Sequence, residues 1–330
     1  MAIFDFDMAD MAWAEWAFAA PLLVGGMGYA AFARALSRNP VALLNAADRI
    51  MRGGNRTVRL VESARFGANP AQKLQVLVPA RRPAGALNNP LPVVVFIHGG
   101  AWMSGDPHDY RFIARTLADH GFAVVLAGYR LLPQGRHPAM LEDGAGALRW
   151  VVDNAARHGL DPGRIAVMGH SAGGYNALML ALDPRWLGAV GLEPAALRAV
   201  IALSAPTDFL PLDDPASTAT FGHIADLAAT QPVNHAHADA PPLLLVHGAD
   251  DRRVRPRNTR ALAAALDRVG APHRAVVLEG MNHEAPLKVL ARPFARDGRV
   301  LAEVLDFLGR VQPSVGPATV ASPTVHPNPC

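Results

Sequence analysis

The chain has 330 residues, of which 51% are hydrophobic and 18% charged, a composition that fits a globular protein with a large core and excludes a polytopic membrane protein. Its net charge of +3 comes from arginines scattered along the chain, and no basic run reaches the length of a nucleic-acid-binding arm, so we expect no nucleic-acid partner. The single cysteine, Cys330, excludes an intrachain disulfide and a buried thiol nucleophile, and this usage indicates a reducing compartment, the cytoplasm.

The N-terminal segment, residues 1–56, is predicted to be apolar and helical, and it has no charged residue from Trp16 to Ala33. That stretch is at the lower limit of length for a membrane-spanning helix, and Pro21 and the nearby glycines weaken it as a span. Three interpretations stay open for residues 16–33: a helix packed on the protein or lying on a membrane surface, a membrane anchor, or a cleaved signal.

Residues 57–311 are predicted to alternate between strands and helices. Two short strands at 57–62 and 74–79 would form a starting hairpin, and continuous apolar runs then predict buried strands. These later strands span 92–97, 122–127, 164–168, 199–203, 243–246 and 275–278, and the helices span 111–120, 139–158, 174–182, 256–269 and 299–309. Such alternation predicts an α/β domain, with a mostly parallel sheet and helices on both faces.

Two stretches depart from the alternation. Residues 206–242 are irregular, and we expect them to lie near the carboxyl ends of the strands and to form a small partial cap there. Residues 312–330 are rich in Pro, Ser, Thr and Val without a period, which predicts a disordered tail.

A serine in a tight strand-to-helix turn is the main candidate for chemistry. The segment Gly169-His170-Ser171-Ala172-Gly173 directly follows the apolar strand at 164–168 and precedes a predicted helix. This is the context that a nucleophile elbow requires, because glycines on either side relieve the close contacts of a strained serine. Ser171 is therefore the predicted nucleophile.

A glycine-rich loop upstream predicts an oxyanion hole. The segment His98-Gly99-Gly100-Ala101-Trp102 directly follows the strand at 92–97. Acyl transfer needs backbone N–H groups aimed at the developing oxyanion, and glycines let the substrate carbonyl approach that backbone. We assign these donors to Gly100, Ala101 and Ala172.

The general base and its acid are expected downstream, in the order serine, acid, histidine. The strand at 275–278 leads to His283, which we predict to be the base, and the strand at 243–246 leads to Asp251, which we predict to orient it. Asp250 stays open as the rival acid. The other histidines are interpreted as structural, and none shows metal-ligand spacing, so neither a metal nor another cofactor is expected.

At these residues the chain resembles the α/β-hydrolase superfamily, over about residues 57–310. The loop at 98–102, the stretch at 129–138 leading to Glu142 and Asp143, and the segment at 160–165 are similar to a branch that includes bacterial carboxylesterases, kynurenine formamidases and isoprenylcysteine methylesterase-like enzymes. The resemblance implies the α/β-hydrolase fold, oxyanion donors at Gly100 and Ala101, and an acid four residues after His247, which is Asp251.

The predicted function is that of a serine carboxylesterase, acting on small-molecule esters through an acyl-enzyme intermediate. The pocket walls are predicted to include one tryptophan, two methionines and two phenylalanines, namely Trp102, Met103, Phe209, Phe221 and Met281. Two alternatives stay open: an arylformamidase-like amidohydrolase, and a non-catalytic binding protein on the same scaffold. The sequence does not specify the oligomeric state.

Overall fold

A computed structural model describes residues 38–82 and 89–311 of the chain. The predictions for residues 16–33 and for the tail at 312–330 lie outside the described residues. Among the helices that the structure does describe, none has both the length and the apolar character needed to cross a membrane.

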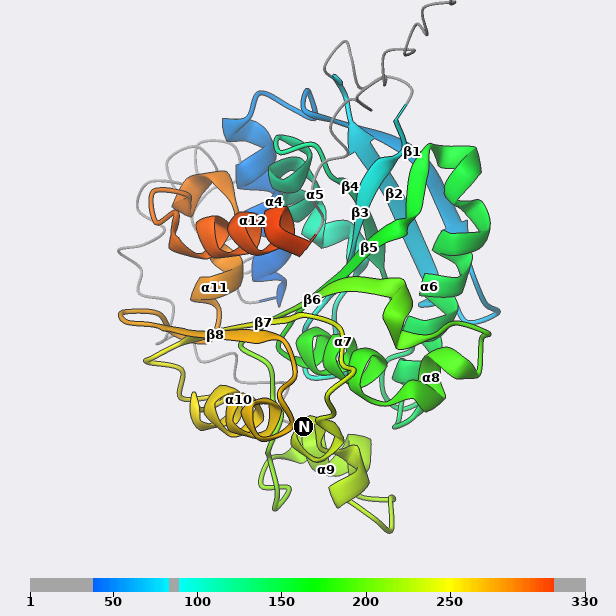
Figure 1. The fold of residues 1–330 in the computed structure, drawn as a ribbon. Helices are drawn as coiled ribbons and strands as arrows, with labels where there is room; N and C mark the ends of the chain where they lie inside the picture. The colour runs from blue at the N-terminus through cyan, green and yellow to red at the C-terminus, as the bar shows by residue number, and fades with distance from the viewer. Residues whose placement is uncertain (1–37, 83–88, 312–330) are drawn as a thin grey trace, which may run out of the picture.

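An eight-stranded sheet forms the centre of the molecule, with the order β1-β2-β4-β3-β5-β6-β7-β8 (Figure 1). Strand β2 pairs antiparallel with both β1 and β4, whereas all the pairs from β4 to β8 are parallel. This sheet confirms the predicted α/β fold. The strands are β1 (Val58–Arg65), β2 (Lys73–Pro79), β3 (Leu91–Ile97), β4 (Ala123–Ala127), β5 (Leu160–His170), β6 (Leu197–Leu203), β7 (Leu243–Gly248) and β8 (His273–Leu278).

Helices cover both faces of the sheet, as the apolar strands require. On one face lie α6 (Ala139–His158), α7 (Ala172–Leu182), α8 (Pro184–Gly188) and α10 (Arg257–Val269). On the other lie α4 (Pro40–Met51), α5 (Arg111–Ala118), α11 (Ala285–Lys288) and α12 (Arg299–Val311). Neighbouring residues of β3 enter opposite layers, since Val93 and Val95 pack with the first set and Val94 and Phe96 with the second.

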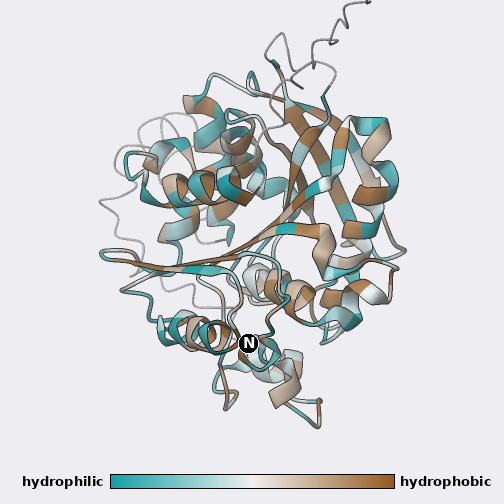
Figure 2. Ribbon diagram, in the orientation of Figure 1, coloured by the Kyte–Doolittle hydropathy of each residue, from teal (hydrophilic) through white to brown (hydrophobic). Residues whose placement is uncertain are grey.

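The hydropathy of each element fits its place in these layers. In Figure 2 the central strands are almost continuously hydrophobic, whereas α10 and α12 alternate between hydrophobic and hydrophilic residues. Helix α7 differs from both, because all eleven of its residues are buried between the sheet and neighbouring helices. The helix that follows Ser171 is therefore fixed on all sides.

The irregular stretch at 206–242 contains α9 (Pro215–Phe221) and two short 3₁₀ helices, Ala228–Thr230 and Pro232–His235. Asp214 caps α9 by accepting hydrogen bonds from the backbone N–H groups of Ala216 and Ser217. The start of the irregular stretch is joined to α10, because the side-chain oxygen of Asn258 accepts the N–H groups of Thr207 and Asp208 at 2.9 and 2.8 Å. The stretch is thus held against the carboxyl ends of the strands.

Candidate active site

Ser171 lies in a strained turn between β5 and α7, with a φ of 52° that residues with a side chain rarely adopt. The glycines beside it are required by space, because a Cβ on Gly169 would meet the backbone of Gly173 and one on Gly173 would meet the backbone of Ile97. The Ser171 N–H donates to the carbonyl of Leu203 on β6 at 2.8 Å. The turn therefore projects Ser171 above the carboxyl edge of the sheet.

The structure brings together Ser171, His283 and Asp251 in one hydrogen-bonded chain. The Oγ of Ser171 is 2.9 Å from Nε2 of His283, and Nδ1 of His283 is 2.7 Å from Oδ2 of Asp251. Asp251 and His283 are 3% and 5% exposed, in loops that follow β7 and β8. Asp250, the rival acid, is exposed and has no side-chain hydrogen bond within the described residues. The geometry thus favours Asp251.

Backbone N–H groups, in addition to His283, hold the Asp251 carboxylate. Its Oδ1 accepts the backbone N–H groups of Arg253 and Val254 at 3.0 and 2.8 Å. Burial opposes its ionisation, but hydrogen bonds from His247 and His283 outweigh burial and lower its pKa well below the usual value. Asp251 is therefore a fixed negative charge facing the ring of His283.

His247 supports Asp251 from behind. Its Nε2 faces two acceptors, the carbonyl of Val254 at 2.6 Å and Oδ2 of Asp251 at 3.2 Å, while Nδ1 lies 2.8 Å from Oγ1 of Thr259. These partners assign the proton to Nε2 and make Nδ1 an acceptor for the threonine hydroxyl. The ring is fully buried. Its position fits the structural role expected for His247.

His170 likewise has a structural role, because it holds the loop that carries His283. Its Nε2 lies 2.9 Å from the carbonyl oxygen of His283, and the centroids of the two rings are 5.0 Å apart. Burial lowers the pKa of His170 to about 3, so the ring stays neutral and donates to that carbonyl from Nε2. The backbone of the loop that carries His283 is thereby tied to the serine turn.

The loop after β3 has an unusual backbone conformation. Ala101 and Trp102 have φ values of 52° and 58°. The indole N–H of Trp102 donates to Oδ1 of Asn176 on α7 at 3.1 Å, which joins the loop to the helix behind Ser171. Throughout the described residues, the N–H groups of Gly100, Ala101 and Ala172 have no acceptor. Unpaired N–H groups are what the predicted oxyanion donors require, and Ala101 and Ala172 line the pocket that contains Ser171.

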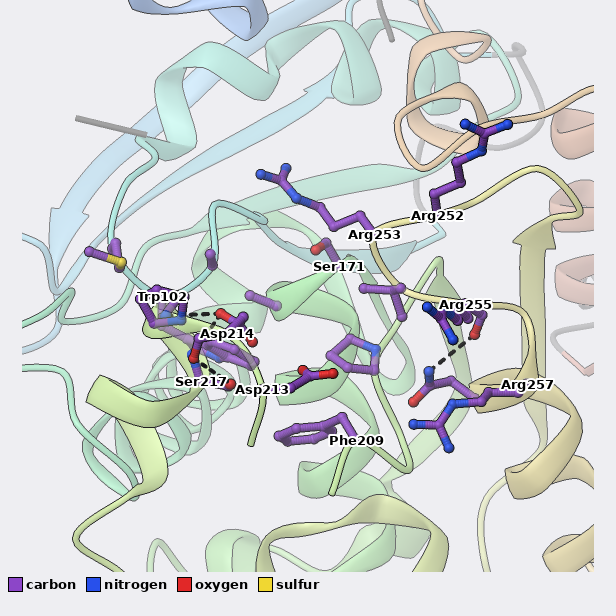
Figure 3. Close-up of a pocket in the computed structure, with 18 residues that line it drawn as sticks. Trp102, Ser171, Phe209, Asp213, Asp214, Ser217, Arg252, Arg253, Arg255 and Arg257 are labelled. Atoms are coloured by element: carbon purple, nitrogen blue, oxygen red, sulfur yellow. Dashed lines mark hydrogen bonds between the residues drawn. The ribbon is translucent and has the colours of Figure 1, made fainter. Parts of the chain in front are cut away.

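A pocket of about 590 Å³ opens in front of Ser171. Three of the predicted pocket walls line it, namely Trp102, Met103 and Phe209 (Figure 3). The other two predictions are wrong. Phe221 is fully buried behind the pocket, where its ring packs edge-on against Trp102 at a centroid distance of 4.9 Å. Met281 is 1% exposed and packs in the core on the α12 side of the sheet.

Sequence reasoning missed most of the pocket rim. Four arginines line it, from a basic run that directly follows Asp251, and two aspartates line it from the start of α9. The run of Arg252, Arg253, Arg255 and Arg257 is visible in the sequence, and its adjacency to the predicted acid was the signal available. Across residues 38–82 and 89–311, no group of three His, Cys, Asp or Glu residues is arranged to hold a metal ion.

The sheet, the strained serine turn and the loops at the carboxyl ends of the strands define the chain as an α/β-hydrolase. The BD-FAE family model matches residues 82–266, more than half of the chain, and the chain therefore belongs to this family. A solved structure, described as a truncated form of carbohydrate esterase from gut microbiota, superposes with a TM-score of 0.66 at 19% identity, covering 78% of this chain and 97% of that one. At this identity the likeness establishes the fold.

Two relatives are similar in sequence over a longer region than the family model covers. A probable isoprenylcysteine alpha-carbonyl methylesterase of Arabidopsis thaliana, ICMEL1, is 27% identical over 240 residues, which are 66% of this chain and 49% of that protein. The esterase LipQ of Mycobacterium tuberculosis is 29% identical over 254 residues, 69% of this chain and 58% of that protein. The chain spans about half the length of the curated relatives it matches.

Proposed function

We propose that the chain is a serine carboxylesterase that hydrolyses small-molecule carboxylic esters. The observation that carries the proposal is the hydrogen-bonded chain from Ser171 through His283 to Asp251, with distances of 2.9 and 2.7 Å. The pocket of about 590 Å³ in front of Ser171 has the size of a small-molecule site. The names of the relatives, a methylesterase and an esterase, support the same substrate class.

Acylation begins when Nε2 of His283 takes the proton of Ser171 as Oγ attacks the ester carbonyl carbon. The carbonyl oxygen becomes an oxyanion, and the N–H groups of Gly100, Ala101 and Ala172 stabilise its charge. Asp251, already anionic, stabilises the protonated ring of His283. The carbon–oxygen bond to the alcohol then breaks, and His283 gives its proton to the departing alkoxide. The acyl group stays on Ser171 as an ester.

Deacylation repeats the same steps with water. His283 takes a proton from the water as its oxygen attacks the acyl carbon, and the same N–H groups hold the second oxyanion. The bond to Ser171 Oγ breaks, the proton returns to that oxygen, and the carboxylic acid leaves. The enzyme returns to its starting state, so the net reaction consumes one water for each ester.

Replacing the nucleophile tests the proposal. Ser171→Ala is expected to lower kcat for a p-nitrophenyl ester by about 10⁴- to 10⁶-fold and to abolish labelling by a fluorophosphonate probe. The circular dichroism spectrum and the melting temperature are the controls for folding. A variant that keeps more than about a tenth of wild-type turnover contradicts the assignment of Ser171.

The same geometry could act on an N-formyl group, so the assay includes N-formylkynurenine beside the ester. Faster Ser171-dependent hydrolysis of the formamide would replace carboxylesterase by arylformamidase as the proposed function. An intact fold without labelling or turnover of either compound would instead favour a binding protein.

A further inference from the structure

Positive and negative side chains lie on different parts of the pocket rim. Arg252, Arg253, Arg255 and Arg257 line it from the loop between β7 and α10, while Asp213 and Asp214 line it from the start of α9. In Figure 3 the aspartates and Trp102 lie on one side of the view and Arg255 and Arg257 on the other. A molecule that fills this pocket therefore meets four guanidinium groups and two carboxylates.

Most of the positive charge on the rim is uncompensated. Asp214 is already engaged as the cap of α9, where it accepts the N–H groups of Ala216 and Ser217 at 2.9 and 3.0 Å. Arg253 has Glu284 as a partner at 3.8 Å. For Arg252, Arg255 and Arg257, by contrast, no carboxylate within residues 38–82 and 89–311 stands at ion-pair distance. The α10 side of the pocket is consequently the cationic side.

Asp251 fixes the backbone of the loop that carries these arginines. Oδ1 of Asp251 accepts the N–H groups of Arg253 and Val254, and the carbonyl of Val254 contacts His247. The side-chain amide of Asn258 donates to the carbonyl of Arg255 at 3.1 Å. Because α10 begins at Arg257, its N-terminal dipole adds to the positive potential. The backbone that carries the four arginines is thus joined to Asp251, which is part of the hydrogen-bonded chain that ends at Ser171.

We propose that the preferred ester carries a carboxylate, and that Arg255 and Arg257 bind this group while the scissile carbonyl lies at Ser171. The inference rests on the proposed esterase function. These two arginines lie on either side of Pro256, the N-cap of α10, where side-chain and helix charges have the same sign, and a guanidinium matches the two oxygens of a carboxylate. Arg252 strengthens the surrounding field. The apolar surface of Trp102, Met103 and Phe209 receives the rest of the substrate.

Matched ester pairs test this on the unmodified protein. Mono-p-nitrophenyl glutarate is compared with its neutral methyl ester for a carboxylate on the acyl side, and p-butanoyloxybenzoate with its methyl ester for one on the alcohol side. In one of the two pairs, kcat/KM for the anionic ester is expected to exceed that for the neutral ester by about tenfold at low ionic strength. About 0.5 M sodium chloride should reduce the preference, since the arginines are exposed. Equal or lower values for the anionic member of both pairs would overturn the proposal.

A charge-matched pair of variants locates the effect. The double variant R255Q/R257Q is expected to lower the anionic-to-neutral ratio of kcat/KM by about tenfold, mainly through KM. The control R260Q/R268Q removes the same charge from exposed positions of α10 outside the pocket and should leave the ratio unchanged. An equal decrease in the control would contradict a local role for Arg255 and Arg257.

The two proposals fail in different ways. Ser171-dependent hydrolysis of the neutral esters without a preference for charge would remove only the carboxylate inference. Absence of fluorophosphonate labelling and of turnover with all four esters would remove the esterase proposal and this inference with it.

Discussion

Ser171, Ala101, Trp102 and Ser204 adopt φ values between 49° and 58°, and no other non-glycine residue in the described part of the chain has a positive φ. All four lie just beyond the carboxyl ends of β3, β5 and β6, and three of them, Ala101, Trp102 and Ser171, line the pocket. A strained residue of this kind costs about 1 to 3 kcal/mol, which persists only where the surroundings fix it. Here the N–H of Ser204 donates to Val246 and that of Ser171 to Leu203, each at 2.8 Å. Strain is therefore concentrated at the proposed site.

A pair of variants tests whether Asp251, and not its neighbour Asp250, orients His283. Asp251→Asn is expected to lower kcat for a p-nitrophenyl ester by about 10⁴-fold, because an amide cannot fix the working tautomer of His283 or stabilise its charge. Asp250→Asn is the matched control, and since its side chain is exposed it should leave kcat nearly unchanged. Both rates are measured at saturating substrate. Similar losses at the two positions would contradict the role proposed for Asp251.

Single residues could be predicted from the sequence where a local pattern constrains them. Ser171 and the loop at 98–102 are marked by glycines that the backbone needs, and these glycines are visible in one short segment each. Phe221 and Met281 carry no such mark. Whether a large apolar side chain faces a pocket or the core depends on packing between distant elements, which the sequence of its own loop does not encode.

Helix α4 precedes the alternating strands and helices of the domain, and a buried carboxylate holds it in place. Leu43, Leu44 and Ala47 pack into the same layer as α5. Asp48, on the same face, is fully buried, and its carboxylate accepts the Nε of Arg115 at 2.5 Å and that of Arg52 at 2.9 Å. Its Oδ1 also accepts the N–H of Arg292 at 2.7 Å. A single carboxylate therefore connects α4, α5 and the segment before α12.

Removing that charge should loosen the whole layer. Asp48→Asn leaves the guanidinium of Arg115, which is 1% exposed, without its counter-ion, and breaking a buried pair in this way costs about 3 to 5 kcal/mol. Urea unfolding should report a decrease of that size in the free energy of unfolding. The control is Asp153→Asn on α6, which removes an exposed ion pair with Arg149 and should not shift the midpoint measurably. A wild-type midpoint for Asp48→Asn would show that the network does not stabilise α4.

Element boundaries were predictable to the extent that local signals define them. Helix α6 has the predicted bounds because Pro138 precedes it and Gly159, with a φ of 64°, ends it. Strand β5 is longer than predicted, since Leu160 pairs with Leu91 of β3 ahead of the polar and turn-forming residues 161–163, which interrupt the apolar run. Helix α9 was hidden in the irregular stretch because it is short, and Asp214 and Pro215 were its only start signals.

At the scale of the molecule, the parallel sheet determines where chemistry can occur. The loops that carry Ser171, Asp251 and His283 leave three different strands at the same edge, although 112 residues separate the serine from the histidine. The alternation of strands and helices predicted a parallel sheet, and the carboxyl edge follows from it. The strand order, with β4 between β2 and β3, depends on long-range pairing and could not be obtained from local patterns.

Three buried histidines link the stability of the whole molecule to pH. His98, His137 and His170 are 1%, 8% and 6% exposed. Burial lowers the pKa of His98 and of His137 to about 4 and that of His170 to about 3. In the unfolded chain a histidine titrates near pH 6.5. Between about pH 6.5 and pH 4 the unfolded chain therefore binds protons that the folded protein does not, and the free energy of unfolding must fall as the pH falls.

Urea unfolding at a series of pH values from about 7.5 to 5 should show this loss, and His98, His137 and His170 together should contribute an uptake of about three protons on unfolding at the acid end of the range. Carboxylates with a lowered pKa, such as Asp251, lose their contribution only at more acid pH, so they do not produce the slope in this range. His137→Leu isolates one contribution, because neither ring nitrogen of His137 has a hydrogen-bond partner among the described residues. The variant should unfold with uptake of about one proton fewer and should gain stability relative to wild type as the pH falls from 7.5. If the variant and the wild type lose stability in parallel, His137 is not one of the groups that make the protein sensitive to acid.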